Sequence, residues 1–129
     1  MEFRKQKGIY LQIADYICEN VLTETWKKGE KILSVREMAA SIEVNPNTVA
    51  RTYSFLQDQG IIYMQRGIGY FVADDALEKT RALRKDDFVN EILPEVFHTM
   101  DVLRMNLSDL EAYYQQRSNG NSSNNENEL

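Results

Sequence analysis

The sequence predicts a mainly α fold with one small β-hairpin, and three observations lead to this prediction. Apolar residues recur at helical spacing near the N-terminus and again from Leu77 to Leu103. Two helix-start signals lie close together, at Ser34 and at Asn45. A β-branched and aromatic stretch, IIYMQRGIGYFVA, lies on both sides of a glycine-rich tip.

The first helix is expected over about residues 8–25. Its apolar residues Ile9, Ile13, Ile17 and Val21 are spaced four apart, which is typical of a helix with one buried face. A connection ending near the glycine of GEKI follows, and the letters EKI predict one short strand.

The second helix is expected over about residues 35–42. Ser34 and Glu37 have the spacing of a capping box, in which the serine oxygen accepts from a backbone amide and the glutamate reaches back. The letters EVN then predict a tight turn before the next helix.

The third helix is expected over about residues 46–59. Asn45 suits the N-cap, and Pro46 suits the first helical position because its missing N–H is not needed there. Gly60 is placed to end the helix in a left-handed conformation. A hairpin over 61–73 should follow, with Arg66 at the base of its tip.

The C-terminal part is expected to form a two-helix arm. The first helix is strongly amphipathic and should bend or break near residues 90–94, because Pro94 cannot donate a helical hydrogen bond. Ser108 and Glu111 predict a capping box and a second, short helix. The polar residues 118–129 predict a disordered tail.

Taken in order, these elements predict a winged helix-turn-helix domain followed by the arm. We expect the domain over 1–74, with the helix-turn-helix at about 34–59 and the wing at 61–73. The arm should occupy 75–117, before the tail.

Composition excludes several classes of function. The chain has one cysteine and one histidine, so we expect no disulfide, no metal site, no cofactor and no enzymatic activity. No apolar run reaches the roughly 18 residues that span a bilayer. The first residues, MEFRKQKG, do not resemble a signal peptide. We therefore expect a cytoplasmic protein without a membrane partner.

The start of the third helix predicts contact with DNA. The second helix of a helix-turn-helix enters the major groove, where its N-terminal residues meet base edges. The net charge is −5, so phosphate contacts must come from a few well-placed cations. The candidate DNA-binding residues are Ser34, Arg36, Asn45, Asn47, Thr48, Arg51, Arg66, Gly67 and Gly69.

The stretch GEKILSVREMAASIEVNPNTVARTYSFLQDQGIIYMQRGIGYFVA resembles the DNA-binding domain of GntR-type bacterial transcription regulators. The matching residues are Gly29, Ser34, Arg36, Met38, Ala39, Thr48, Val49, Tyr53, Leu56, Gly67, Gly69 and Val72. Leu33, Thr52 and Tyr70 depart from the family pattern. Pro46 departs too, and stands where many members carry a DNA-contacting arginine.

The short arm resembles the YtrA-type subgroup, which implies that two C-terminal helices form a homodimer. The apolar stripe that would form the interface comprises Phe88, Val89, Ile92, Leu93, Val96, Phe97, Met100 and Leu103. The alternative is that the arm packs on its own domain. The resemblance further implies a target that is often a membrane-transporter operon.

The sequence thus predicts a homodimeric repressor that binds a palindromic site on double-stranded DNA. A small-molecule effector at the dimer interface is a further expectation, although the sequence does not identify it. The alternative function is a winged-helix protein-interaction module without DNA binding. The acidic balance and Phe55, which lies off the inward stripe of its helix, favour that alternative.

Overall fold

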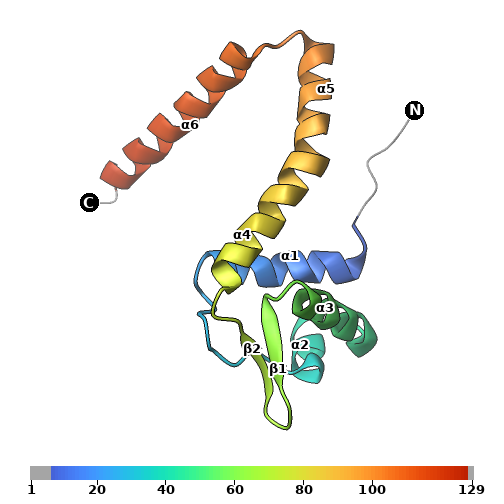
Figure 1. Ribbon diagram of the computed structural model, residues 1–129. Helices are drawn as coiled ribbons and strands as arrows, with labels where there is room; N and C mark the ends of the chain where they lie inside the picture. The colour runs from blue at the N-terminus through green and yellow to red at the C-terminus, as the bar shows by residue number, and fades with distance from the viewer. Residues whose placement is uncertain (1–6, 128–129) are drawn as a thin grey trace. The chain divides into compact units, whose positions relative to one another are not determined.

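The computed structural model describes residues 7–127 of the chain, with side chains as far as residue 119. The chain divides into two compact units, Met1–Lys85 and Asp86–Leu129. Within the described residues the structure is helical apart from one two-stranded antiparallel sheet (Figure 1). The predicted fold class, mainly α with a small hairpin, is confirmed.

The first unit contains a three-helix cluster beside a hairpin (Figure 1). Its elements are α1 (Ile9–Leu22), α2 (Val35–Ile42), α3 (Pro46–Asp58), β1 (Ile62–Gln65), β2 (Gly69–Val72) and most of α4 (Ala76–Asp87). The α3 helix packs against both α1 and α2 and also contacts β1. It is therefore the central element of this unit.

The core of the first unit forms where the apolar faces of these helices meet. Ile17 of α1 and Val49, Tyr53 and Leu56 of α3 are fully buried. The Tyr53 hydroxyl donates a 2.6 Å hydrogen bond to the Leu33 carbonyl. Burial raises the pKa of this hydroxyl above its ordinary value, so it remains a donor.

Thr52, one departure from the family pattern, has a clear structural role. Its side chain is fully buried, and its hydroxyl donates a 2.7 Å hydrogen bond to the Tyr10 carbonyl of α1. An alanine at this position could not make that bond. The threonine therefore joins α3 to the first turn of α1.

The hairpin is extended by a single bridge rather than by a full third strand. The predicted strand EKI contributes one antiparallel bridge, between Lys31 and Phe71. The Ile32 amide donates to the Tyr70 carbonyl at 2.9 Å, and the Gly29 amide donates to the Val72 carbonyl at 2.8 Å. These bonds tie the segment before α2 to β2.

The second unit is helical in its described part, apart from the short connection at 104–106. The backbone continues from α4 through a π-helical turn, Phe88–Ile92, into α5 (Leu93–Leu103). This turn lies at the predicted break, because Pro94 in the first turn of α5 lacks the N–H that a regular α-helix would use. No described helix is both long enough and apolar enough to cross a membrane.

The last helix, α6 (Leu107–Asn127), differs from the sequence prediction at its start. The cap is Asn106 with Asp109, not Ser108 with Glu111. The Asp109 amide donates to Asn106 Oδ1, and the Asn106 amide donates to Asp109 Oδ2, both at 2.9 Å. Asparagine is at least as good an N-cap as serine, and an acidic residue follows three positions later, so the earlier pair determines where the helix begins.

The end of α6 also differs from the prediction. Polar composition places the end of regular structure at residue 117, whereas the helix continues to Asn127. The segment contains no proline, so an α-helix begun at the Asn106 cap meets no residue that must stop it. The boundary of the tail is corrected accordingly.

Candidate nucleic-acid interface

The first turn of α2 is fixed by the predicted capping box. The Glu37 amide donates to Ser34 Oγ at 3.1 Å, and the Ser34 amide donates to Glu37 Oε1 at 3.0 Å. The bond from the Ser34 backbone amide is the main reason why the pKa of Glu37 lies below its usual value. Arg36 lies exposed in this fixed turn. Ser34 Oγ already accepts a bond, so the hydroxyl hydrogen is what it can offer to a phosphate.

A tight turn joins α2 to α3. Glu43 adopts a left-handed conformation with φ 56°, and the Val44 amide donates to the Ala39 carbonyl at 3.0 Å. The helix α3 then begins at Pro46, with Asn45 as its N-cap. The two helices therefore have the connection that a helix-turn-helix requires.

The first turn of α3 presents polar groups to solvent. Asn45 Oδ1 accepts a 2.8 Å hydrogen bond from the Asn47 amide, which leaves the Asn45 side-chain NH₂ as a donor. Asn47 is exposed and Thr48 is half-buried. The Asn47 side chain makes no hydrogen bond within the described part of the chain and can offer both a donor and an acceptor.

Arg51 has a different environment from the one expected. Its guanidinium carbon lies 3.8 Å from the centroid of the Tyr10 ring, so the side chain packs on the first turn of α1. Tyr10 also meets Phe55 edge-to-face, with ring centroids 6.3 Å apart. Phe55 therefore has an internal partner, which removes the support that it gave to a protein-interaction surface.

The wing is a regular hairpin in which Ile62 pairs with Val72 and Gln65 with Gly69. The Ile68 amide donates to the Gln65 carbonyl at 2.9 Å and closes the turn. Gly67 and Gly69 adopt φ values of 78° and 142°, which other residues rarely tolerate. Arg66 is exposed beside this tip.

Lys31 is a cation at the wing that sequence reasoning missed. A Cβ atom at Gly69 would lie 2.9 Å from Lys31 Cε, so the lysine side chain crosses the space that the glycine leaves open. The side chain is exposed, and its charge contributes to lowering the pKa of Glu37. The bridge to Phe71 that orients Lys31 joins residues far apart in sequence, so no local signal could have identified it.

The predicted residues thus fall into three groups on neighbouring elements. Ser34 and Arg36 belong to the start of α2, and Asn45, Asn47 and Thr48 to the start of α3. Arg66, Gly67 and Gly69 belong to the wing, to which the structure adds Lys31. The α2 and α3 helices pack together, and α3 contacts β1 (Figure 1). Arg51 differs, because it faces α1.

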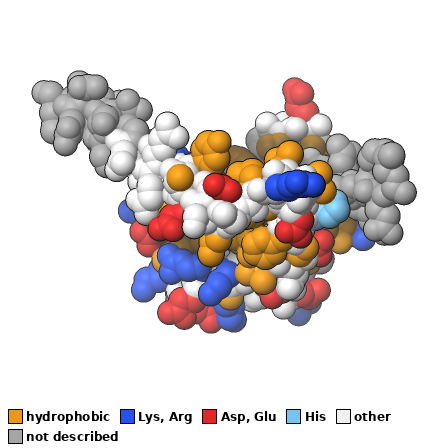
Figure 2. Space-filling view, turned by 90° about the horizontal axis from the view of Figure 1, so that it is seen from above, with side chains coloured by type: hydrophobic (Ala, Val, Ile, Leu, Met, Phe, Trp, Pro, Cys, Tyr) orange, Lys and Arg blue, Asp and Glu red, His pale blue; other side chains and the backbone are white. Residues whose placement is uncertain are grey.

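The second unit presents a different kind of surface. No residue of the π-helical turn or of α5 is buried in the single chain. Phe97 is 50% exposed and Leu103 is 61% exposed. Of the predicted stripe, Phe88 and Val89 are also exposed, whereas Ile92, Leu93, Val96 and Met100 are half-buried. Figure 2 shows hydrophobic side chains at the surface among charged ones.

Within residues 7–119, whose side chains the structure describes, no group of three or more His, Cys, Asp or Glu side chains could hold a metal ion. The described surface is instead one of backbone amides, amide side chains and isolated cations, which are groups that recognise phosphates and base edges.

Comparison with known proteins agrees with this geometry. Residues 9–72 match the model of the bacterial regulatory proteins of the gntR family. The uncharacterized HTH-type transcriptional regulator YhcF of Bacillus subtilis is 45% identical over 71% of this chain and 74% of its own. The HTH-type transcriptional repressor YtrA of the same organism is 41% identical over 57% of this chain and 56% of its own.

The similarity extends to solved structures. A GntR-family transcriptional regulator from Bacteroides thetaiotaomicron superposes with a TM-score of 0.75 and is 38% identical. The match covers 88% of this chain and 99% of that one, so it extends beyond the winged helix into the helical arm.

Proposed function

Because the chain belongs to the GntR family of bacterial regulatory proteins, whose members are DNA-binding transcription regulators, we propose that it is a homodimeric repressor. Each protomer would place the start of α3 in a major groove, with the wing at the adjacent minor groove. Two-fold symmetry of the dimer would then match a palindromic operator.

The observation that carries the proposal is the exposed polar first turn of α3. The Asn45 cap and Pro46 fix the backbone, so that Asn47 projects from the helix start without a side-chain partner. An asparagine amide can bond an adenine edge through two hydrogen bonds. Half-buried Thr48 of α3 and exposed Arg36 of α2 would contact the DNA backbone and fix the register of the protein on the duplex.

Dimerisation is proposed from the exposed apolar face of the arm. Leaving Phe97 and Leu103 in water is unfavourable, at about 25 cal/mol per Å² of apolar surface. A second copy would present the same face and could cover both stripes. This use of the arm agrees with the YtrA-type resemblance.

Repression is proposed because occupation of a promoter is sufficient for it, and because a relative carries the name of a repressor. The target proposed from the family resemblance is a transporter operon that includes the regulator's own gene.

The test is footprinting of the DNA upstream of the chain's own operon at two salt concentrations. We expect a protected palindrome whose affinity falls steeply as salt rises, because each neutralised phosphate releases counterions. A duplex of the same composition with one half-site scrambled is the control. Equal protection of both duplexes would contradict sequence-specific recognition, and absence of protection at low salt would contradict the choice of operator.

A further inference from the structure

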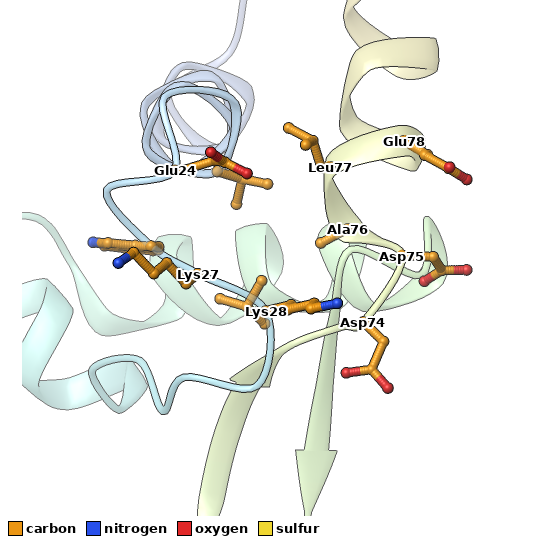
Figure 3. Close-up of a pocket in the computed structure, with 11 residues that line it drawn as sticks. Glu24, Lys27, Lys28, Asp74, Asp75, Ala76, Leu77 and Glu78 are labelled. Atoms are coloured by element: carbon orange, nitrogen blue, oxygen red, sulfur yellow. The ribbon is translucent and has the colours of Figure 1, made fainter.

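A cleft of about 600 Å³ lies in the first unit, within the size range of small-molecule sites. It is lined by the end of α1, the loop that follows, the end of β2 and the first turn of α4 (Figure 3). The first turn of α3 and the tip of the wing do not line it. A ligand in this cleft would therefore not occupy the surface proposed to bind DNA.

The cleft has an apolar base and apolar walls. Buried Val21, Val72 and Ala76 line it, and half-buried Trp26 lines it from the loop and half-buried Leu77 from α4. The Trp26 ring meets the Tyr16 ring edge-to-face, with centroids 6.5 Å apart. These walls can receive the hydrocarbon part of a ligand.

The loop that forms one wall is held at both ends. The Trp26 amide donates to the Asn20 carbonyl at 3.0 Å, and the Gly29 amide donates to the Val72 carbonyl at 2.8 Å. Glu24 adopts a left-handed conformation with φ 57°, although it is not a glycine. Because the loop is already ordered, a ligand would not have to pay for ordering it.

Opposite charges reach the cleft at separate places. Figure 3 shows the Glu24 carboxylate extending toward Leu77, and the Lys28 side chain extending toward Asp74. Lys27 adds a second cation to the loop. The carboxylates of Asp75 and Glu78 point away from the loop. Asp75 forms an ion pair with Lys79 at 3.1 Å. Among the described residues, no ion pair joins the loop to the α4 side of the cleft.

We propose that this cleft binds a small zwitterion with an apolar body, of the class of amino acids with large apolar side chains. The ligand's ammonium would meet Glu24, its carboxylate would meet Lys28, and its side chain would lie between Trp26 and Leu77. A neutral apolar molecule would leave both charged groups unused. A ligand with a single charge would satisfy only one of them.

Isothermal titration of the full chain with three matched probes tests the proposal. L-phenylalanine carries both charges, 2-phenylethylamine lacks the carboxylate, and 3-phenylpropanoate lacks the ammonium. For a ligand of this size we expect a dissociation constant on the order of 0.1–1 mM for phenylalanine. Each single-charge analogue should bind at least about tenfold more weakly.

Two charge-removing variants locate the site. Glu24→Gln and Lys28→Met should each weaken phenylalanine binding, by about fivefold or more. Lys28→Met should also abolish the preference for phenylalanine over 2-phenylethylamine, because the partner of the carboxylate is gone. Glu19→Gln and Lys85→Met are the controls, since both positions are exposed and outside the cleft.

Absence of binding by phenylalanine up to about 20 mM would overturn the proposal, since that is far above the expected constant. Equal binding of phenylalanine and either analogue would overturn the zwitterion assignment. Binding that neither cleft variant weakens would place the ligand elsewhere and overturn the site. The titration contains no DNA, so its outcome is independent of the proposed repressor function.

Discussion

At the scale of single residues, two exposed cations on neighbouring elements have different surroundings. Arg51 stacks on Tyr10, with its guanidinium carbon 3.8 Å from the ring centroid. Lys31 is oriented across Gly69 at the wing. The sequence favours Arg51 as a DNA contact because of its place in the third helix. The side-chain contacts in the structure favour Lys31 instead.

Lys31→Ala should weaken binding to all duplexes by a similar factor, because a lysine at the wing meets phosphate rather than bases. The dependence of log affinity on log salt should become shallower by about one. Fluorescence anisotropy at several salt concentrations measures both quantities. Lys85→Ala, which removes an exposed lysine from α4, should leave both unchanged. An unchanged salt slope for Lys31→Ala would exclude the phosphate contact.

Asn47→Ala should instead weaken binding selectively. Loss of a bidentate contact to a base costs about 1–3 kcal/mol and relaxes the preference at one base pair. Competition with duplexes substituted at each operator position would identify that base pair. If every duplex lost affinity equally, Asn47 would be a backbone contact.

At the scale of elements, the capping box of α2 predicts a dependence of stability on pH. The pKa of Glu37 is lowered from 4.5, chiefly by its bond from the Ser34 amide. A lowered pKa in the folded state means that the stabilisation is present at neutral pH and is lost as pH falls through the folded value. The stability difference between the native chain and Glu37→Gln should therefore shrink below about pH 4.5. Urea unfolding at neutral and acidic pH measures it, and a constant difference would contradict the role of the ionised carboxylate.

Elements defined by local signals could be predicted from the sequence. The starts of α2 and α3 follow from Ser34 with Glu37 and from Asn45 with Pro46, and the structure confirms both caps. The start of α6 was predicted wrongly because two pairs with capping-box spacing overlap there, and only the pair of Asn106 and Asp109 is used.

Features that depend on distant contacts could not be predicted from the sequence. The Thr52 hydroxyl bonds Tyr10, which is 42 residues away along the chain. The stack of Arg51 on the same tyrosine and the position of Lys31 over Gly69 also require the folded arrangement of α1, α3 and the sheet. The cleft could not be predicted from the sequence for the same reason, because the two stretches that line it, 21–28 and 72–78, lie far apart along the chain.

At the scale of the whole molecule, the proposed dimer predicts how a charge on the arm should act. Phe97→Glu places a carboxylate on a side chain that is 50% exposed in the single chain, so the protomer should still fold. The dimer should dissociate, because a buried unpaired charge is costly. Operator affinity should fall as well, since two linked half-site contacts bind more tightly than one.

Sedimentation velocity and anisotropy measure these two effects of Phe97→Glu. Thr99→Glu is the matched control, because it adds the same charge to an exposed position about 200° around the same helix. Dissociation of both variants, or of neither, would contradict an interface formed by the apolar stripe.

In the described part of the chain, three connections contain a non-glycine residue in the left-handed conformation, and these residues are Glu24, Glu43 and Arg104. Such a conformation costs a side-chain-bearing residue about 1 kcal/mol relative to glycine. A glycine at any of these positions would therefore increase the stability of the folded state. Glu43→Gly and Arg104→Gly should each raise the melting temperature by a few degrees, which calorimetry measures. Glu24→Gly should also raise the melting temperature. Because it removes the carboxylate from the cleft, the same variant should bind phenylalanine more weakly.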